Sequence, residues 1–219
     1  MQLSYEFIEE EKNAAPAAEA PERGKLFTSR NIAWFAILLA LTVVLQIWGS
    51  AIRIGANTVN LSLIPVVLAA ILLGPLGGAV TGFVSGAVVL VYVILGAEPL
   101  SLMMFQDHPF ITVALVLVKG TAAGVASGLI YKAFAKKHPY AGTFAAAAAA
   151  PVVNTGLYIL GALLMSDTIA RSGFADGMSA IYFLVVVAAG VNFLIEFAVN
   201  MVASPAVFSV IKVVKKRVY

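Results

Sequence analysis

The chain has 219 residues, is 61% hydrophobic and only 11% charged, and has a mean hydropathy of +0.97, which excludes a soluble globular domain and predicts an integral membrane protein. Its net charge of +3 does not indicate nucleic-acid binding, because in a membrane protein the distribution of Lys and Arg is more informative than their sum. Cysteine is absent, which excludes disulfides, thiol catalysis and cysteine metal sites.

Residues 1–28 form a polar, acidic leader that carries six of the eleven acidic side chains. The leader lacks the basic start and short apolar core of a signal peptide, so we expect it to stay attached and to lie in the cytoplasm. Its composition is typical of a disordered or partly helical tail. Residues 29–219 are expected to form a single transmembrane domain.

Six apolar runs predict an all-α fold with six transmembrane helices. Most runs have the ~20 residues needed to cross the hydrocarbon core, whereas the second is short and contains Pro65. Apolar residues in the loop over 96–108 predict that this loop folds back onto the protein. The predicted helices cover residues 32–49, 61–73, 76–95, 109–132, 141–165 and 180–214.

Basic residues predict the orientation. Six helices place both termini on one side, and eleven of the fourteen Lys and Arg residues then lie on that side. The positive-inside rule assigns this side to the cytoplasm. Of the other three, Arg53 and Arg171 lie outside and Lys119 lies in the membrane.

Glycine recurs at every fourth residue in two predicted helices, which leaves one face of each helix almost without side chains. In a bilayer such a face is the main route to close helix packing. We expect these faces to hold helices of this chain together, and an interface with another protein is the alternative. The two series are Gly78, Gly82 and Gly86, and Gly120, Gly124 and Gly128.

Lys119 and Glu196 are the ionisable side chains predicted within the hydrocarbon region, where a charge costs a few kcal/mol and needs a reason. Lys119 lies ~15 Å from the outer end of its helix, near the midplane. Asn192 and Asn200 flank Glu196 at spacings of four, so the three share a helix face.

A second polar stripe consists of Asn154 and Tyr158, which are also four residues apart. Both stripes should face the bundle interior, because lipid would leave their donors and acceptors unpaired. They are suited to bind the heteroatoms of a small polar molecule. The alternative is that Lys119 and Glu196 pair with each other and that the asparagines cross-link helices, which we favour for Asn200. The candidate substrate-binding residues are Asn57, Asn60, Lys119, Asn154, Tyr158, Asn192 and Glu196.

Sequence motifs for catalysis are lacking, and we expect neither enzymatic activity, nor a cofactor, nor a metal site. No phosphate-binding Gly-x-x-x-x-Gly-Lys loop, His-x-x-x-His pair or Gly-x-Ser-x-Gly elbow is present. His108 and His138 are predicted on opposite sides of the membrane and so cannot share a metal. Active uptake would require an ion gradient or a partner that hydrolyses ATP.

The run Leu-Leu-Gly-Pro-Leu-Gly-Gly-Ala-Val-Thr-Gly over residues 72–82 follows a short helix that contains proline. With six helices of this total length, it resembles the substrate-binding S components of energy-coupling factor (ECF) transporters, over residues 30–217. The resemblance implies high-affinity capture of a water-soluble vitamin or related micronutrient, such as riboflavin or another B vitamin. It also implies partnership with a transmembrane coupling protein and two cytoplasmic ATPases in a bacterial-type cell membrane.

The resemblance also implies roles for two further groups of residues. In that family an alanine stripe on the first helix contacts the coupling protein, and the first outside loop is a gate over the site. These roles fall on Ala33, Ala36 and Ala40 for the partner interface, and on Arg53, Asn57 and Thr58 for the gate.

A stand-alone secondary transporter or channel for a small polar solute is the alternative function, and a structural membrane protein is a third. The substrate itself stays open. Arg53, Lys119 and Arg171 suit a carboxylate, whereas Asn154, Tyr158 and Asn192 suit a neutral hydroxylated or heteroaromatic compound such as riboflavin. Pantothenate, folate, pyridoxine-like and thiamine-like ligands are all compatible with these side chains.

Overall fold

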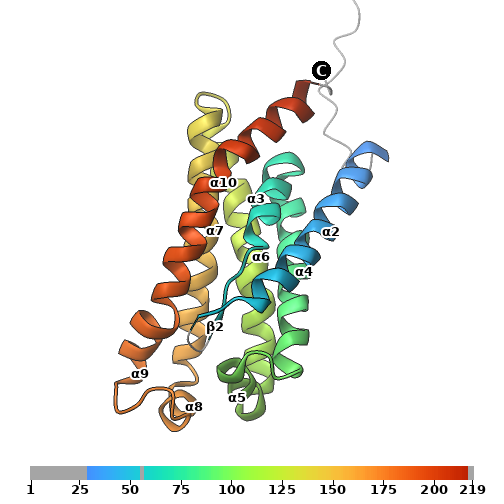
Figure 1. The fold of residues 1–219 in the computed structure, drawn as a ribbon. Coiled ribbons are helices and arrows are strands. Elements are labelled where there is room, and N and C mark those ends of the chain that lie inside the picture. Colours follow the sequence, from blue (N-terminus) through green and yellow to red (C-terminus); the bar gives the residue numbers. More distant parts are fainter. Residues whose placement is uncertain (1–28, 55–56, 217–219) are drawn as a thin grey trace, which may run out of the picture.

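The computed structural model describes residues 29–54 and 57–216, so the predicted leader lies outside the described residues. This part of the chain is almost entirely helical (Figure 1). In chain order the elements are α2 (Ser29–Ala51), β1 (Arg53–Ile54), β2 (Asn57–Thr58), α3 (Leu63–Leu72), α4 (Gly74–Ile94), α5 (Pro99–Asp107), α6 (Pro109–Phe134), α7 (Pro139–Leu163), α8 (Ser166–Arg171), α9 (Ala180–Tyr182), the π-helix η1 (Phe183–Ala188) and α10 (Gly190–Lys216).

Five helical segments are long and apolar enough to cross a membrane, and they correspond to five of the six predicted helices. The remaining predicted helix is present as α3, which has 10 residues. At 1.5 Å per residue α3 spans about 15 Å, which is half of a hydrocarbon core. The five spans are Ile32–Ala51, Gly74–Ile94, Pro109–Phe134, Pro139–Leu163 and Ala180–Val214.

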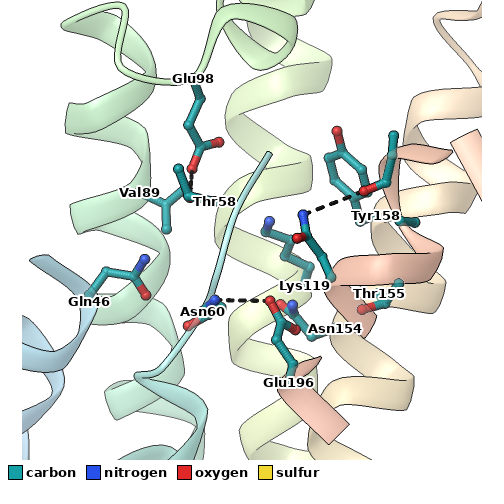
Figure 2. Close-up of a pocket in the computed structure, with 13 residues that line it drawn as sticks. Gln46, Thr58, Asn60, Val89, Glu98, Lys119, Asn154, Thr155, Tyr158 and Glu196 are labelled. Atoms are coloured by element: carbon teal, nitrogen blue, oxygen red, sulfur yellow. Dashed lines mark hydrogen bonds between the residues drawn. The ribbon is translucent and has the colours of Figure 1, made fainter. Parts of the chain in front are cut away.

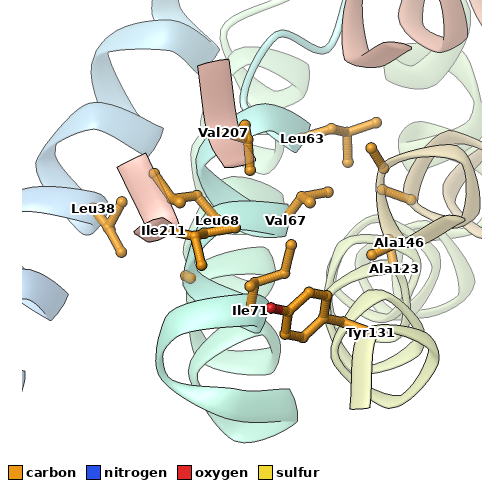
Figure 3. Close-up of a cluster of buried hydrophobic side chains, with 13 residues drawn as sticks. Leu38, Leu63, Val67, Leu68, Ile71, Ala123, Tyr131, Ala146, Val207 and Ile211 are labelled. Atoms are coloured by element: carbon orange, nitrogen blue, oxygen red, sulfur yellow. The ribbon is translucent and has the colours of Figure 1, made fainter. Parts of the chain in front are cut away.

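The short helix α3 lies in the centre of the bundle (Figure 3). Its residues are apolar on every side, which is typical of a helix that is surrounded by protein. Leu63 and Val67 are at most 1% exposed, and they pack against residues of α2, α6, α7 and α10. The members of this core include Leu38, Leu63, Val67, Leu68, Ile71, Ala123, Tyr131, Ala146, Val207 and Ile211.

The two glycine series face each other across α4 and α6. A Cβ atom added at Gly78 would lie 2.5 Å from the carbonyl oxygen of Gly124, and one added at Gly120 would lie 2.5 Å from that of Gly82. These distances are too short for any real Cβ, so the two backbones are in direct contact. The expectation that the glycines pack helices of this chain together is confirmed.

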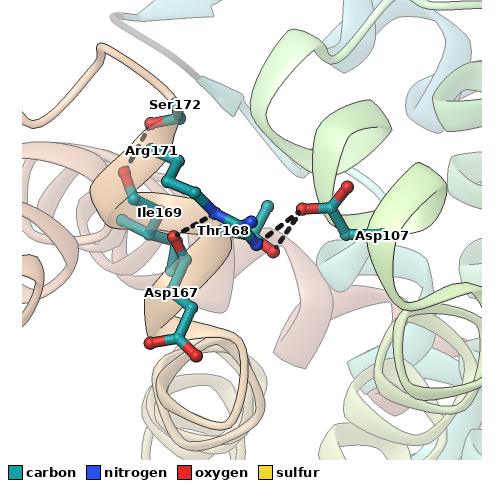
Figure 4. A network of polar contacts seen from close by, with 6 residues as sticks. All are labelled: Asp107, Asp167, Thr168, Ile169, Arg171 and Ser172. Atoms are coloured by element: carbon teal, nitrogen blue, oxygen red, sulfur yellow. Dashed lines mark hydrogen bonds and ion pairs between the residues drawn. The ribbon is translucent and has the colours of Figure 1, made fainter.

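Two predicted outer loops contain helices. The loop over 96–108 forms α5, whose Leu100 and Met104 are buried, so the prediction that it folds back onto the protein is confirmed. Proline is well suited to the first position of α5, because the first N–H of a helix has no intrahelical partner. In Figure 4, Asp107 at the end of α5 faces α8, and its Oδ2 accepts hydrogen bonds from Thr168 Oγ1 at 2.7 Å and from Arg171 Nη2 at 3.4 Å.

The segment between α2 and α3 enters the bundle instead of remaining outside it. The strands β1 and β2 pair Arg53 with Thr58, and the chain then runs inward; the two strands and the residues that follow them up to Asn60 are called the ribbon below. Asn60 is 8% exposed and Ser62 is fully buried. Non-helical backbone at membrane depth is tolerated where protein buries it or where it lines a cavity, and both conditions apply here. Asn60, a candidate substrate-binding residue, is therefore part of the bundle interior.

The start of α2 and the end of α10 lie at the same end of the bundle, opposite α5 and α8 (Figure 1). The turn between α6 and α7 lies at this end as well, and Lys132, Lys136 and Lys137 are exposed there. This arrangement is compatible with the predicted orientation, which stays a prediction because no membrane is part of the structure.

Candidate functional site

A polar cavity of about 50 Å³ lies inside the bundle (Figure 2). Because a single water needs ~10–15 Å³ measured in this way, the cavity has room for a few waters or for one small chemical group. Side chains of α2, the ribbon, α4, the start of α5, α6, α7, η1 and α10 surround it. They are Gln46, Thr58, Asn60, Val89, Glu98, Lys119, Asn154, Thr155, Tyr158, Ala188, Ala189, Asn192 and Glu196.

Six of the seven candidate substrate-binding residues line this one cavity. Helical periodicity accounts for four of them, since Asn154 and Tyr158 share a face of α7 and Asn192 and Glu196 share a face of α10. Lys119 and Asn60 join them from α6 and from the ribbon. Thr58 also lines the cavity, and we predicted it as part of the gate and not as a substrate-binding residue. The side chains of Asn57 and Arg53 lie outside the described part of the chain.

Gln46 and Glu98 also line the cavity, although we did not predict them as site residues. For Gln46 a signal was available, because Thr42, Gln46 and Ser50 recur every fourth residue and are all buried. Glu98 has no such signal. It directly precedes α5, and its burial to 7% exposure depends on contacts with the distant ribbon.

The ribbon is hydrogen-bonded to both carboxylates of the cavity (Figure 2). The backbone N–H of Asn60 donates to Glu196 Oε1 at 3.0 Å, and Thr58 Oγ1 donates to Glu98 Oε1 at 2.6 Å. Ser101 Oγ donates to the other oxygen of Glu98 at 3.1 Å. Residues 40 and 136 positions away along the chain thus hold the ribbon as one wall of the cavity.

A group of buried polar side chains fixes the inner end of the ribbon to α2 and α4. Ser62 Oγ lies 2.7 Å from Asn60 Oδ1, 2.8 Å from Gln46 Oε1 and 2.5 Å from Ser85 Oγ. Ser85 Oγ also donates to Gln46 Oε1 at 3.1 Å. These close contacts between buried polar groups favour one arrangement of the chain.

Lys119 lies against an aromatic ring. Its Nζ atom is 5.0 Å from the centroid of the Tyr158 ring, which is within the range of a cation–π interaction. The Nζ atom of Lys119 is not within 4.0 Å of either carboxylate oxygen of Glu196, and both side chains are in the described part of the chain. Lys119 and Glu196 therefore do not form the direct ion pair that the sequence left open as the alternative.

Three acceptor atoms at the cavity are buried and lack a hydrogen-bond partner among the described residues: Asn154 Oδ1, Asn192 Oδ1 and Glu196 Oε2. The three residues are at most 6% exposed. An unsatisfied buried acceptor costs about 1–3 kcal/mol, so a cluster of three needs an explanation. A ligand or solvent with hydrogen-bond donors would satisfy all three.

The π-helix η1 directly precedes the cavity residues of α10. The N–H of Ala189 bonds to the carbonyl of Leu184, five residues back, at 2.8 Å. A π-turn inserts one extra residue and thereby changes which residues of the following helix face inward, and such turns are frequent at functional sites. A Cβ at Gly190 would lie 2.9 Å from the Val185 carbonyl oxygen, so glycine suits the end of this turn.

Other candidate residues lie away from the cavity. Asn200 is buried one turn further along α10, and its Nδ2 donates to the carbonyl of Glu196 at 2.8 Å, within its own helix. Ala33, Ala36 and Ala40 are exposed on α2. Among residues 29–54 and 57–216, no group of three or more His, Cys, Asp or Glu side chains is placed to hold a metal.

A comparison with protein families gives a match that covers most of the chain. The model of the family described as "ECF transporter, substrate-specific component" matches residues 30–208. Neither a curated protein nor a solved structure matches the chain.

Proposed function

The chain belongs to the family of substrate-specific components of ECF transporters, and we propose that it captures a water-soluble vitamin or related micronutrient in the polar cavity for ATP-driven uptake. Members of this family are substrate-binding proteins of transporters and not enzymes, and this one is a multi-pass membrane protein. The observation that carries the proposal is the convergence of Asn60, Lys119, Asn154, Tyr158, Asn192 and Glu196 on one cavity within an otherwise apolar bundle.

The ribbon is the proposed gate. Pockets for vitamin-sized ligands measure ~300–1,000 Å³, whereas this cavity has about 50 Å³ and is closed on one side by the ribbon. A substrate therefore enters only when the ribbon moves away. That movement breaks the Thr58–Glu98 and Asn60–Glu196 hydrogen bonds, and the two carboxylates then face the entering molecule.

The partners are a transmembrane coupling protein and two cytoplasmic ATPases. We assign the contact with the coupling protein to the exposed stripe of Ala33, Ala36 and Ala40 on α2. Small side chains allow close approach of a second helix, which is the main source of helix association in lipid. The cell membrane of a bacterium is the proposed location.

Reconstitution in liposomes tests this function. The chain is incorporated alone or together with an ECF coupling protein and its two ATPases, and uptake of labelled riboflavin, thiamine, pyridoxine, pantothenate and folate is measured. Uptake that needs both the partners and internal ATP supports the proposal. Accumulation driven by an ion gradient across liposomes that contain the chain alone contradicts it and favours a secondary transporter.

A further inference from the structure

We infer, building on the proposed function, that the substrate presents N–H donors and a positive charge to the part of the cavity lining that Asn154, Asn192 and Glu196 form. A protonated amine, or an amino group on a cationic heteroaromatic ring, has this chemistry. The inference rests on which atoms of the cavity lack a partner and on the charges that surround them.

The unpaired atoms are all acceptors. Asn154 Oδ1, Asn192 Oδ1 and Glu196 Oε2 are buried without a partner, whereas no buried side-chain donor within the described ranges is left unpaired. A substrate that offered only acceptors, such as a carboxylate or a carbonyl, would leave all three unsatisfied. A substrate with N–H groups would satisfy them.

The identity of two of these acceptors does not depend on how the amides are oriented. Asn192 Nδ2 donates to the Ala188 carbonyl oxygen at 3.4 Å, so a flipped amide would bring two oxygens together. Both oxygens of the Glu196 carboxylate are acceptors, and Oε1 already accepts from the Asn60 N–H at 3.0 Å. The remaining lone pairs of Oε2 are available to the substrate.

The formal charge of the described lining is negative. Counted with both carboxyl groups ionised, Glu98 and Glu196 contribute two negative charges and Lys119 contributes one positive charge, which gives a formal sum of −1. Lys119 Nζ lies over the Tyr158 ring and not within ion-pair distance of either carboxylate. A monocation brings the sum to zero, whereas a monoanion makes it −2, in a region where charges are poorly screened.

One of the cations that suited an anionic substrate in the sequence lies away from the cavity. Arg171 pairs with Asp107 at 3.4 Å on the surface between α5 and α8, and its side chain is 71% exposed. It does not line the cavity. Of the described cations considered for a carboxylate, only Lys119 is at the site.

Matched ligand pairs test this inference directly. Binding of pyridoxamine is compared with that of pyridoxine, and binding of thiamine with that of oxythiamine, by calorimetry on the full chain in detergent; within each pair, an amino group is replaced by an oxygen-bearing group. In at least one pair, we expect the amino compound to bind about tenfold tighter or more, because it presents more N–H donors to the unpaired acceptors than its oxygen analogue does, and the ammonium group of pyridoxamine adds a charge that pyridoxine lacks.

Variants identify the group that is responsible. Glu196→Gln should reduce that preference to less than about threefold, since it replaces the unpaired carboxylate by a neutral amide. Asp167→Asn is the matched control, because this carboxylate is exposed on α8 and its substitution should leave the preference unchanged. The ligand pairs alone keep the test valid if Glu196→Gln does not fold.

Failure of the inference is distinguishable from failure of the proposed function. If riboflavin, pantothenate or biotin binds more tightly than every amino compound, the chain is a vitamin-binding protein and the inference is overturned. If none of these compounds binds and none is taken up in liposomes, the proposed function fails, and the inference fails with it.

Discussion

Glu196 has two roles at the level of single atoms. Its Oε1 accepts the N–H of Asn60 and so holds the ribbon, while its Oε2 is unpaired at the cavity. Glu98 differs, because both of its oxygens accept hydrogen bonds from hydroxyl groups, one of them from Thr58 of the ribbon. Both carboxylates therefore hold the ribbon by a hydrogen bond. Of the two, Glu196 is the one with an unpaired oxygen at the cavity.

Thr58→Val should make the ribbon open more readily. The substitution keeps the shape of the side chain and removes the hydroxyl that donates to Glu98 at 2.6 Å. A hydrogen bond to a charged group contributes about 1.5–3 kcal/mol, so we expect ligand dissociation to accelerate about tenfold or more. Stopped-flow fluorescence with a bound vitamin measures this rate.

Thr121→Val serves as the control for this variant. The Thr121 hydroxyl donates to the carbonyl of Leu117 in its own helix at 2.8 Å, and Thr121 does not line the cavity. Its substitution should leave the dissociation rate unchanged. Equal rates for Thr58→Val and the wild type would show that the Thr58–Glu98 bond does not hold the gate.

At the residue scale, the local period of a helix explains which site residues the sequence predicted. Spacing of four alone placed Asn154 with Tyr158 and Asn192 with Glu196, and the same rule applied to α2 would have found Gln46. Glu98 and the depth of Asn60 were not predictable in this way. Their positions depend on contacts between segments that are far apart in the sequence and have no helical period.

At the scale of helices, the contact between α4 and α6 depends on the absence of side chains. Gly78→Ala should destabilise the protein by about 1–3 kcal/mol, because its Cβ would lie 2.5 Å from the carbonyl oxygen of Gly124 and would force the backbones apart. Thermal unfolding in detergent, followed by circular dichroism, measures the loss.

Gly156→Ala on α7 is the matched control. No atom lies within 4 Å of a Cβ built at Gly156, and alanine has the higher helix propensity by about 1 kcal/mol. This variant should be as stable as the wild type or more stable. If the melting temperature of Gly78→Ala equals that of Gly156→Ala, the close contact of α4 and α6 does not stabilise the fold.

Elements that repeat a short pattern were predictable, and the others were not. The glycine series and the long apolar runs gave α4, α6 and their contact, because both signals are local. The inward path of the ribbon and the shortness of α3 result from packing by five surrounding helices. The π-turn over Phe183–Ala188 lies within a uniformly apolar run that contains no signal for it.

At the scale of the whole molecule, the orientation of the bundle in the membrane is open to a direct test. We expect the end that carries Lys137 to face the cytoplasm and the end that carries Asp167 to face outside. The chain has no cysteine, so single-cysteine variants report on topology without background. Asp167→Cys should react with a membrane-impermeant maleimide in intact cells, and Lys137→Cys only after permeabilisation. The reverse pattern would contradict the orientation.

The outer surface of α2 provides a second test at this scale. Ala36→Trp places a large side chain on an exposed position away from the cavity, so ligand binding should be unchanged. Assembly with the coupling protein should be lost, because a bulky group prevents close approach of two helices. Co-purification with a tagged coupling protein measures assembly. Unimpaired co-purification would move the interface to another face of the molecule.

The central claim is that the polar cavity binds the substrate, and ligand-induced stabilisation tests it most directly. Melting temperatures are measured for the wild type, Asn192→Ala and Asn200→Ala with a panel of water-soluble vitamins. A ligand at 1,000 times its Kd stabilises the folded state by about 4 kcal/mol, which is a large shift. We expect one compound to stabilise the wild type and Asn200→Ala equally, and to stabilise Asn192→Ala much less. Equal stabilisation of all three proteins would place the substrate elsewhere and contradict the account.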